Sequence, residues 1–376
     1  TTIHSFCLSV IRDHFPMIGL DPAFRIGEEG ELKLLRHDVL DELLEEEYTE
    51  GRSQFLDFVS AYGTGKNDKK IEELILKVYE YSRSYPDAQE WLRECVKGYE
   101  LENLDELEES PYVDLLKMYV ELYLEDARAR LYQGIEICRE ESGPYMYEDA
   151  LEDDLRMVER VLGAETYLGL SEYMGDISWM KLPPNRDKTV SSDKADQVKL
   201  IRDEVKELMK DLNQQYFYAE PEIILKDIKG CQPMVRELTS LVEKFAERFE
   251  EKKRTKNMID FSDMEQYAMK ILTEKTEGGF CPTAAAEEYQ EQFLEIMIDE
   301  YQDSNLIQET ILTSVSRYSR GEYNIFMVGD VKQSIYRFRL SRPELFMEKY
   351  DTYSTEDSDT QRIDLHKNFR SRAEVL

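Results

Sequence analysis

Two adjacent carboxylates follow a short apolar run near residue 300. The run spans residues 293–298 and leads into Asp299 and Glu300. If this run is a strand of a parallel sheet, the pair lies at the carboxyl edge, where such sheets bind ligands. One carboxylate can then hold Mg²⁺, and the next can activate the water that attacks a γ-phosphate. Carboxylates also often end a strand where a turn begins, so the pair alone does not identify a site.

A second group of candidate residues follows the apolar run at 323–328. Gly329 permits a tight exit from a strand, and Gln333 stands four residues later. The neutral amide of Gln333 can contact a phosphate oxygen and a water together. This pair of residues is therefore suited to sensing a terminal phosphate.

Cations and aromatic rings alternate in the residues that come next. The segment 331–342 carries four Lys or Arg residues and no acid. Tyr336 precedes Arg337, and Phe338 lies between Arg337 and Arg339. Aromatic faces and guanidinium groups together bind single-stranded nucleic acid, by stacking on bases and pairing with phosphates. The alternative is a basic amphipathic turn with two core aromatics.

A third group, Phe369 and Arg370, lies near the end of the chain after a run at 362–365. An arginine beside an aromatic ring could clamp a nucleotide, with the base on the ring and the γ-phosphate on the guanidinium. No GxxxxGK[ST] phosphate loop is present in this sequence. The GTGKN at residues 63–67 lacks the first glycine and the final Ser or Thr, so we do not expect it to bind phosphate.

The first two thirds of the chain read as helical, from about residue 28 to 256. The clearest helix begins with Ser110 as N-cap and Pro111 in the first turn. Apolar residues then recur every three or four positions from Val113 to Cys138, which places one stripe on one helix face. Further stripes run from Val198 to Leu212 and from Val235 to Phe249. Residues 182–196 are predicted to be an irregular surface loop.

The pattern changes after about residue 258. Short apolar runs at 293–298, 323–328 and 362–365 alternate with helical patterns at about 262–273, 304–319 and 343–350. Short buried strands that alternate with helices are typical of a parallel α/β sheet. The sequence thus predicts a mostly helical region followed by an α/β region.

The overall charge argues against nucleic acid as a ligand. The chain has 376 residues, a formal net charge of −32 and a mean hydropathy of −0.59. Phosphates attract cations, although a bound strand feels mainly the charges within a Debye length of about 8–10 Å. No stretch reaches the roughly 18 apolar residues of a membrane span. Five widely spaced cysteines favour a reducing compartment, the cytoplasm, over a disulfide framework.

Taken together, the motifs resemble those of the UvrD/PcrA-like superfamily 1 helicases, whose motor is a pair of RecA-like domains. Residues 299–303 (DEYQD) resemble helicase motif II, 329–339 (GDVKQSIYRFR) motif III, and 368–371 (NFRS) the start of motif IV. Residues 2–6 (TIHSF) resemble motif Ib. Residues 260–264 (DFSDM) resemble the segment where the chain of this family returns from an inserted helical domain.

For the nucleotide site, the resemblance implies a role for each matching residue. Asp299 would hold Mg²⁺, Glu300 would activate the hydrolytic water, and Gln333 would couple the γ-phosphate of ATP to DNA. Phe369 would lie near the adenine, and Arg370 would reach the γ-phosphate. ATP and Mg²⁺ are the implied cofactors.

For DNA, the resemblance implies contacts at both ends of the chain. Thr2 and His4 would contact the DNA, and Tyr336, Phe338 and Arg339 would touch the single strand. Phe338 stands where many relatives have tryptophan, and it can still stack.

The resemblance also implies a domain organisation. Residues 1–20 would be an N-terminal piece of a RecA-like motor domain, 21–256 an inserted α-helical domain, and 257–376 the motor domain with motifs II, III and the start of IV. The phosphate loop would precede Thr1, so we expect an internal fragment with little or no ATP hydrolysis of its own.

The phrases TIHSFC, RFRLSRPELF and KNFRSRAEVL look most like the AddA branch of this family. That resemblance implies a partner protein, AddB, and a helicase–nuclease that processes double-strand DNA ends for recombination. Its nuclease site would lie outside this chain. Two other interpretations remain open: a non-motor scaffold that docks DNA or a partner, and a metal-dependent nuclease using Asp299, Glu300 and Asp303. Adjacent strand residues tend to point opposite ways, which disfavours the nuclease.

Overall fold

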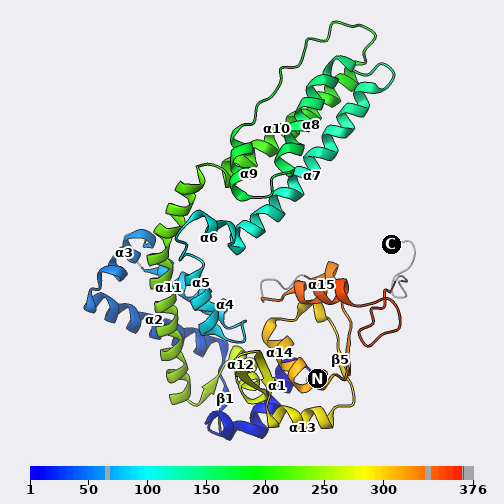
Figure 1. Cartoon of the computed structure of the whole chain (residues 1–376). Coiled ribbons are helices and arrows are strands. Elements are labelled where there is room, and N and C mark those ends of the chain that lie inside the picture. The colour runs from blue at the N-terminus through cyan, green and yellow to red at the C-terminus, as the bar shows by residue number, and fades with distance from the viewer. Residues whose placement is uncertain (64–67, 335–339, 366, 368–376) are drawn as a thin grey trace. The chain divides into compact units, whose positions relative to one another are not determined.

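The computed structural model describes residues 1–63, 68–334, 340–365 and 367 (Figure 1). These residues are mostly helical, with three two-stranded sheets, of which two are parallel. The chain divides into two compact units, one of residues 95–233 and one of residues 1–94 with 234–376. Within the described residues, no helix is long and apolar enough to cross a membrane.

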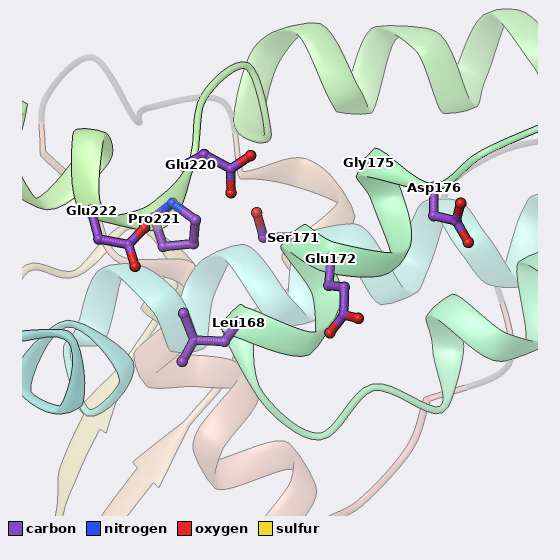
Figure 2. A pocket seen from close by; sticks show the side chains of 8 residues that line it. All are labelled: Leu168, Ser171, Glu172, Gly175, Asp176, Glu220, Pro221 and Glu222. Atoms are coloured by element: carbon purple, nitrogen blue, oxygen red, sulfur yellow. The ribbon is translucent and has the colours of Figure 1, made fainter.

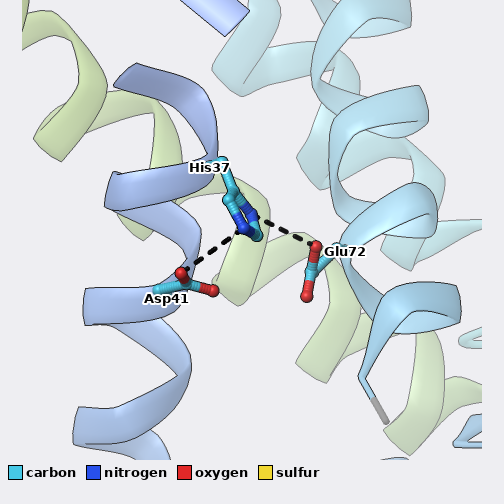
Figure 3. A group of neighbouring side chains, drawn as sticks. All are labelled: His37, Asp41 and Glu72. Atoms are coloured by element: carbon cyan, nitrogen blue, oxygen red, sulfur yellow. Dashed lines mark ion pairs between the residues drawn. The ribbon is translucent and has the colours of Figure 1, made fainter. Parts of the chain in front are cut away.

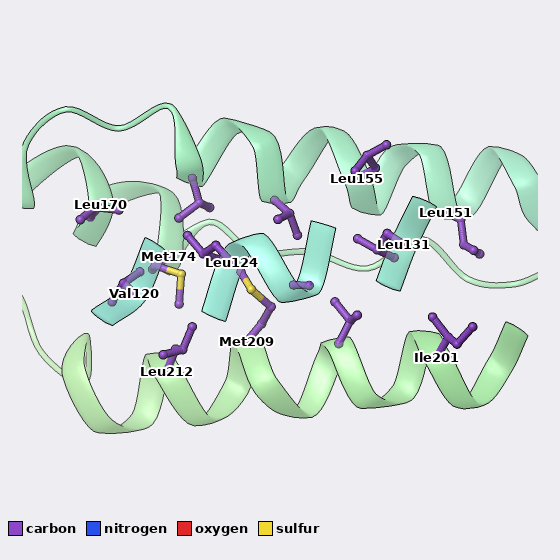
Figure 4. Packing of buried hydrophobic residues seen from close by; sticks show 14 of the residues in the cluster. Val120, Leu124, Leu131, Leu151, Leu155, Leu170, Met174, Ile201, Met209 and Leu212 are labelled. Atoms are coloured by element: carbon purple, nitrogen blue, oxygen red, sulfur yellow. The ribbon is translucent and has the colours of Figure 1, made fainter. Parts of the chain in front are cut away.

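The unit of residues 95–233 is a helical bundle. Its main helices are α7 (Pro111–Arg139), α8 (Glu148–Leu162) and α10 (Ser192–Tyr216), with the shorter α6 (Leu104–Glu108) and α9 (Tyr167–Gly175). As predicted, Ser110 caps α7, because its hydroxyl accepts the N–H of Val113. The predicted apolar stripe of α7 faces α8 and α10 and forms the core of the unit (Figure 4).

Two polar features complete this bundle. The ion pair of Arg202 with Asp154 is almost fully buried and joins α10 to α8. The connection before α10 is irregular as predicted, but it ends at Ser191 rather than at 196. The Ser191 hydroxyl accepts the N–H of Lys194 and so starts α10 five residues earlier than expected.

The second unit contains a separate helical core. It is built from α2 (Glu29–Glu50), α3 (Ser53–Tyr62), α4 (Lys69–Ser82) and the C-terminal half of α11 (Pro221–Thr255). The helix α5 (Ala88–Lys97) contributes the buried Leu92. Phe245 and Phe249 of α11 are fully buried in this core, as the predicted stripe requires. Phe55 and Phe58 of α3 pack in the same cluster.

A third core surrounds α1 (Ile3–His14), which packs against α12 (Phe261–Leu272). The 3-10 turn η1 (Phe15–Ile18) leads to β1 (Arg25–Ile26), which pairs in parallel with β2 (Met258–Ile259). The hairpin of β3 (Thr273–Thr276) and β4 (Gly279–Pro282) follows α12, and α13 (Ala284–Gln292) and α14 (Leu306–Val315) complete this core. Residues far apart in sequence therefore share one core.

Three buried charges and the partly buried Arg83 lie at the junction of α11 with the start of α12. The ammonium of Lys253, only 2% exposed, pairs with Asp260 at 2.9 Å and with Asp263. Arg83 donates to the other oxygen of Asp263 at 3.0 Å. Asp260 also caps α12, and the N–H of Asp260 donates to Asp263, which forms a capping box. Two positive and two negative charges balance each other at this junction.

The last part of the chain contains β5 (Ile296–Ile298), β6 (Ile325–Met327) and α15 (Pro343–Thr352), with 3-10 turns η3 (Tyr301–Asp303), η4 (Tyr318–Arg320) and η5 (Val331–Gln333). The sequence prediction of buried strands here is wrong, because Met297 is 72% and Phe326 56% exposed. The prediction of a strand at 362–365 is also wrong. Those residues are irregular, with Leu365 84% exposed, and no described strand pairs with them.

Candidate functional site

The two candidate motifs near residues 300 and 330 lie side by side. Strands β5 and β6 are parallel and hydrogen-bonded, with Ile296 opposite Ile325 and Ile298 opposite Met327. The pairing continues past the strands, since Val328 N–H donates to Ile298 at 2.8 Å. Because both strands end at the same edge, the residues after each of them meet there.

Glu300 turns the chain away from the sheet. Its backbone is left-handed, with φ 53° and ψ 40°, which a residue with a Cβ adopts at a cost of about 1–2 kcal/mol. Asp299 accepts the N–H of Glu300 at 3.1 Å, and η3 begins at the next residue. Strain of this kind gathers at functional sites. Glu300, to which the resemblance assigns the hydrolytic role, is one of four non-glycine residues with positive φ among the described residues.

A buried glutamine joins the two motifs. The Gln302 side chain donates from Nε2 to Glu300 Oε2 at 2.6 Å and accepts the N–H of Asp330 at 3.0 Å. Gln302 is only 1% exposed. A Cβ added to Gly329 would lie 2.6 Å from Gln302 Oε1 and 2.9 Å from Phe346. Glycine is therefore required at 329 by close packing rather than by its φ angle.

The loop after β6 is organised around Asp330. Its carboxylate accepts the N–H of Lys332 at 3.0 Å and a hydrogen bond from Gln333 Nε2 at 2.9 Å. The bond from Gln333, followed by that from Lys332, lowers the pKa of Asp330. These bonds hold the exposed amide of Gln333 in the loop that follows β6.

Helix α15 is fastened to η3 by a charged network. The buried Tyr301 hydroxyl donates to Glu309 at 2.6 Å, and Lys349 pairs with the other oxygen of Glu309 at 2.7 Å. Burial, followed by the charge of Glu309, raises the pKa of Tyr301. Lys349 also lies 5.2 Å from the centre of the Tyr301 ring.

The segment predicted to bind DNA has both of its neighbouring stretches tied down. After this segment, the Arg342 N–H donates to the carbonyl of Ser304 at 2.8 Å. The Arg342 guanidinium lies 4.8 Å from the centre of the Tyr85 ring. Both flanks of residues 335–339 are therefore bonded to residues 302–304. The remaining predicted residues lie outside the described part of the chain: Tyr336, Phe338, Arg339, Phe369 and Arg370.

The other predicted DNA contacts lie at the start of α1. The hydroxyl of Thr2 caps this helix by accepting the N–H of Ser5 at 3.3 Å, and Thr2 is exposed. His4 is 3.4 Å from Glu265 and edge-on to Phe261. The structure thus assigns Thr2 a local capping role and leaves its outer face open to solvent.

Glu265 connects α1 to the helix that follows motif II. Its Oε1 accepts from Gln308 at 2.7 Å and lies 3.4 Å from His4 Nε2, while its Oε2 accepts from Asn305 at 3.3 Å. Asn305 is the N-cap of α14. A buried carboxylate with three polar neighbours therefore links the two ends of the sequence.

The oxygen donors around Asp299 fit Mg²⁺. This cation prefers one or two carboxylates together with substrate phosphates and water, and the Asp299 carboxylate is exposed at the strand end. Oδ1 of Asp303 is buried and has no hydrogen-bond partner among the described residues. Desolvation and the charge of Glu300 raise the pKa of Asp303. The nearby carboxylates can thus supply hard oxygen ligands.

A nuclease-type cluster of Asp299, Glu300 and Asp303 is not supported. Within the described residues, the one group of three such ligands that converges within 4.8 Å is His37, Asp41 and Glu72 (Figure 3). There the two imidazole nitrogens face different carboxylates, at 3.6 and 3.7 Å, and His37 and Asp41 are exposed while Glu72 is partly buried. Ion pairing accounts for this arrangement.

A hollow in the helical bundle is also unrelated to the motifs. It has a volume of about 410 Å³ and lies between α9 and the start of α11 (Figure 2). Four carboxylates line it: Glu172, Asp176, Glu220 and Glu222. Carboxylates repel phosphates, so this hollow is not suited to a nucleotide.

The sequence analysis assigned no role to Gln302 or Glu265. Gln302 lies within the DEYQD phrase, but only the fold shows what it contacts. For Glu265 a signal was available, because it stands on a helix face with Ala268, Met269 and Leu272, all of them buried. A carboxylate on an apolar stripe requires a polar partner, and so it marks a buried network.

Comparisons with known proteins give a consistent result. The family model described as the UvrD/REP helicase N-terminal domain matches residues 1–354. A relative from Lachnoclostridium phytofermentans, named as a subunit of an ATP-dependent helicase/nuclease, is 46% identical over 100% of this chain and 28% of its own length. Proteins of the same name from Geobacillus thermodenitrificans and Alkaliphilus metalliredigens are 40% and 39% identical over 100% of this chain, and over 31% and 30% of their own lengths. The chain spans less than a third of each relative.

Proposed function

We propose, because this chain belongs to the UvrD/REP helicase family, that it forms part of the motor of an ATP-dependent DNA helicase. The observation that carries this proposal is the meeting of two motifs at one sheet edge. Asp299 and Glu300 end β5, while Gly329 and the loop to Gln333 end β6, and hydrogen bonds join them.

In this proposal each residue at the sheet edge has one task. Glu300 accepts a proton from the water that attacks the γ-phosphate of ATP. Gln333, which is hydrogen-bonded to Asp330, contacts that phosphate and so links the phosphate to the loop after β6. Asp299 would hold Mg²⁺, which when bound neutralises charge on the phosphates. Phe369 and Arg370 complete the site, at the adenine and the γ-phosphate.

Single-stranded DNA is the proposed track of the motor. Tyr336 and Phe338 stack on bases and Arg339 pairs with phosphates, while Thr2 and His4 contact the strand from α1. The overall charge of −32 requires these contacts to be local. The described residues Asp330 and Arg342 are hydrogen-bonded to Gln302 and Ser304, beside the proposed hydrolytic centre.

We further propose the domain organisation expected from the sequence. Residues 1–20 and 257–376 would belong to a RecA-like domain and 21–256 to an inserted helical domain. The exposure of Met297 and Phe326 supports this, because parallel sheets are normally covered on both faces. Helices cover the faces of such sheets, so in this proposal helices of the motor domain would cover Met297 and Phe326. The 376-residue chain by itself is then expected to hydrolyse ATP very slowly or not at all.

For the whole protein, the names of the relatives support one component of a helicase–nuclease. We propose an AddA-type protein that acts in the cytoplasm on double-strand DNA ends during recombinational repair. It would pair with AddB, and its nuclease site would lie outside this chain.

The test is ATP hydrolysis by the full-length protein, with and without single-stranded DNA. Glu300→Gln should lower turnover by about 10²–10⁴-fold, because it removes the base that activates water. The matched control is Glu295→Gln, the same change at an exposed residue before β5, which should turn over like the wild type.

Two results would contradict the proposal. Glu300→Gln with wild-type turnover would exclude Glu300 as the hydrolytic base. A wild-type protein that binds DNA without hydrolysing ATP would support the scaffold instead.

A further inference from the structure

We propose that the outer face of α7 is a docking surface for an amphipathic helix of another protein, one that carries Lys or Arg along one edge. The centre of this surface is a line of four apolar residues, called here the outer stripe: Leu115, Met118, Tyr119 and Leu122. The stripe lies outside all the helicase-like motifs, so the inference does not depend on the proposed ATP hydrolysis.

The spacing of the outer stripe is that of a helix-docking face. Its residues stand at positions i, i+3, i+4 and i+7, so they form one line along the helix. Helices that bind in the grooves of other proteins use anchors at the same spacing. Leu115, Met118 and Leu122 are 61%, 63% and 68% exposed, and Tyr119 is 37% exposed. Single exposed apolar residues are common, but a contiguous line of them marks an interaction surface.

Helix α7 is apolar on two opposite faces, unlike its neighbours in the bundle. Its inner face, which includes Val120 and Leu124, forms the core of the unit (Figure 4). With about 3.6 residues per turn, the outer stripe lies on the opposite side of the helix. Among the described residues, α8 exposes no large apolar side chain and α10 exposes only Leu200. Since a helix that is apolar all round is normally buried, we expect a partner to cover the outer stripe.

The two edges of the outer stripe differ in their chemistry. On the side of α10, the Tyr119 ring lies 4.6 Å from that of Tyr123 and 5.6 Å from that of Tyr216, measured between ring centres. Asp114 and Glu121 stand along the other edge, seven residues apart, and both are exposed. In the part of the chain that the structure describes, neither carboxylate has an ion-pair partner. An apolar, tyrosine-rich centre with a charged rim is typical of a protein interface.

The unpaired carboxylates determine the charge of the partner. A helix with Lys or Arg along one edge could pair with Asp114 and Glu121 while its apolar face covers the outer stripe. A second copy of this chain would bring the same carboxylates against each other, and the net charge of −32 adds to that repulsion. Nucleic acids and anionic membranes are repelled for the same reason. These observations therefore favour a basic amphipathic helix.

The test measures binding of a synthetic peptide to the full-length protein by fluorescence anisotropy. The peptide is an amphipathic helix of about 20 residues, with leucines on one face and lysines along one edge. Leu115→Gln/Leu122→Gln should weaken binding by at least about tenfold, because two apolar anchors are lost. Asp114→Asn/Glu121→Gln should weaken binding by about two- to tenfold at low salt, as expected for exposed ion pairs.

The matched control is Leu200→Gln on α10. Leu200 is 60% exposed, close to the value for Leu115, but Asp196, Asp203 and Glu204 surround it on its helix face. This variant should bind the peptide like the wild type. A second peptide, with glutamates in place of the lysines, should bind the wild type at least about tenfold more weakly, because its charges repel those of α7.

Each outcome bears on the inference. Weaker binding by the stripe and carboxylate variants, with wild-type binding by Leu200→Gln, supports it. Unchanged binding by Leu115→Gln/Leu122→Gln overturns it, and equal binding of the two peptides overturns the basic partner. No binding by the full-length wild type would mean that the stripe is not open to another protein. A dimer seen in sedimentation velocity that Leu115→Gln/Leu122→Gln abolishes would make a second copy the occupant instead.

Discussion

Replacing Lys253 by methionine should weaken the junction of α11 and α12 more than any single surface change. Lys253 is 2% exposed and holds Asp260 at 2.9 Å together with Asp263. Methionine fills a similar volume but leaves two buried carboxylates facing the single guanidinium of Arg83. One uncompensated negative charge then remains in the interior.

The size of the effect follows from the geometry. At an effective dielectric constant of about 20, one ion pair at this distance is worth about 6 kcal/mol before desolvation is subtracted. Removing one partner of a buried pair costs about 3–5 kcal/mol in net free energy of unfolding. Desolvation works against ionised Asp260, but the charge and hydrogen bond of Lys253 prevail and lower its pKa to about 2.

The pH dependence gives a second signature. A carboxyl with a lowered pKa stabilises the fold fully above its unfolded pKa of about 3.9, and this is lost as pH falls towards 2. For Asp260 the difference amounts to about 2–3 kcal/mol. Without Lys253 the pKa of Asp260 should rise. The free-energy gap between variant and wild type should therefore narrow as pH falls from about 5 towards 2, where the wild type loses this contribution.

Hydrogen exchange measured by mass spectrometry on peptides of α11 and α12 is the assay. Lys253→Met should speed exchange there by about 10²–10³-fold, corrected for intrinsic rates at each pH. The double variant Lys253→Met/Asp260→Asn restores charge balance and keeps an N-cap residue. It should be less destabilised than the sum of the single variants by about 1–3 kcal/mol.

Either of two results would refute this reasoning. Exchange of α12 at the wild-type rate in Lys253→Met would show that water already screens the cluster. Strict additivity of the two substitutions would show that the charges do not act on each other.

Two further predictions concern the packing of single elements. Tyr301→Phe removes the bond to Glu309 and should destabilise the attachment of α15 by about 1–2 kcal/mol, seen as about tenfold faster exchange at 343–352. Unchanged exchange there would mean that Lys349 alone holds α15. Leu131→Ala empties a fully buried position of α7 and should cost about 2–5 kcal/mol, measured by exchange of α8 and α10. If hydrogen exchange in α12 became faster by the same factor as in α8 and α10, the two units would not unfold separately.

Helices were predictable where local signals agreed. Ser110 and Pro111 mark the start of α7, and its stripe of apolar residues sets which face is buried, because both depend on neighbours within a turn. The loop before α10 was predicted to end at residue 196, but Ser191 caps α10 and the helix begins at Ser192. Such errors at helix ends are expected when only local chemistry is available.

Strands were harder to predict, because a strand exists only with a partner. The runs at 296–298 and 325–327 form β5 and β6, but residues 362–365, where Ile363 and Leu365 alternate with charged residues, stay irregular. The prediction of buried strands failed for the same reason, because the exposure of Met297 depends on what covers the sheet rather than on its own residue type.

The sequence by itself determined which residue types stand where at the candidate site. Asp299, Glu300, Gly329 and Gln333 could be named from order and spacing, because these motifs are contiguous in the chain. Only the tertiary structure decided how they meet. The register of β5 with β6 brings Gln302 against Asp330, 28 residues apart, and Glu265 against His4, 261 residues apart, follows from the packing of α1 on α12. Contacts between distant residues depend on the register and packing of whole elements, which local sequence patterns do not contain.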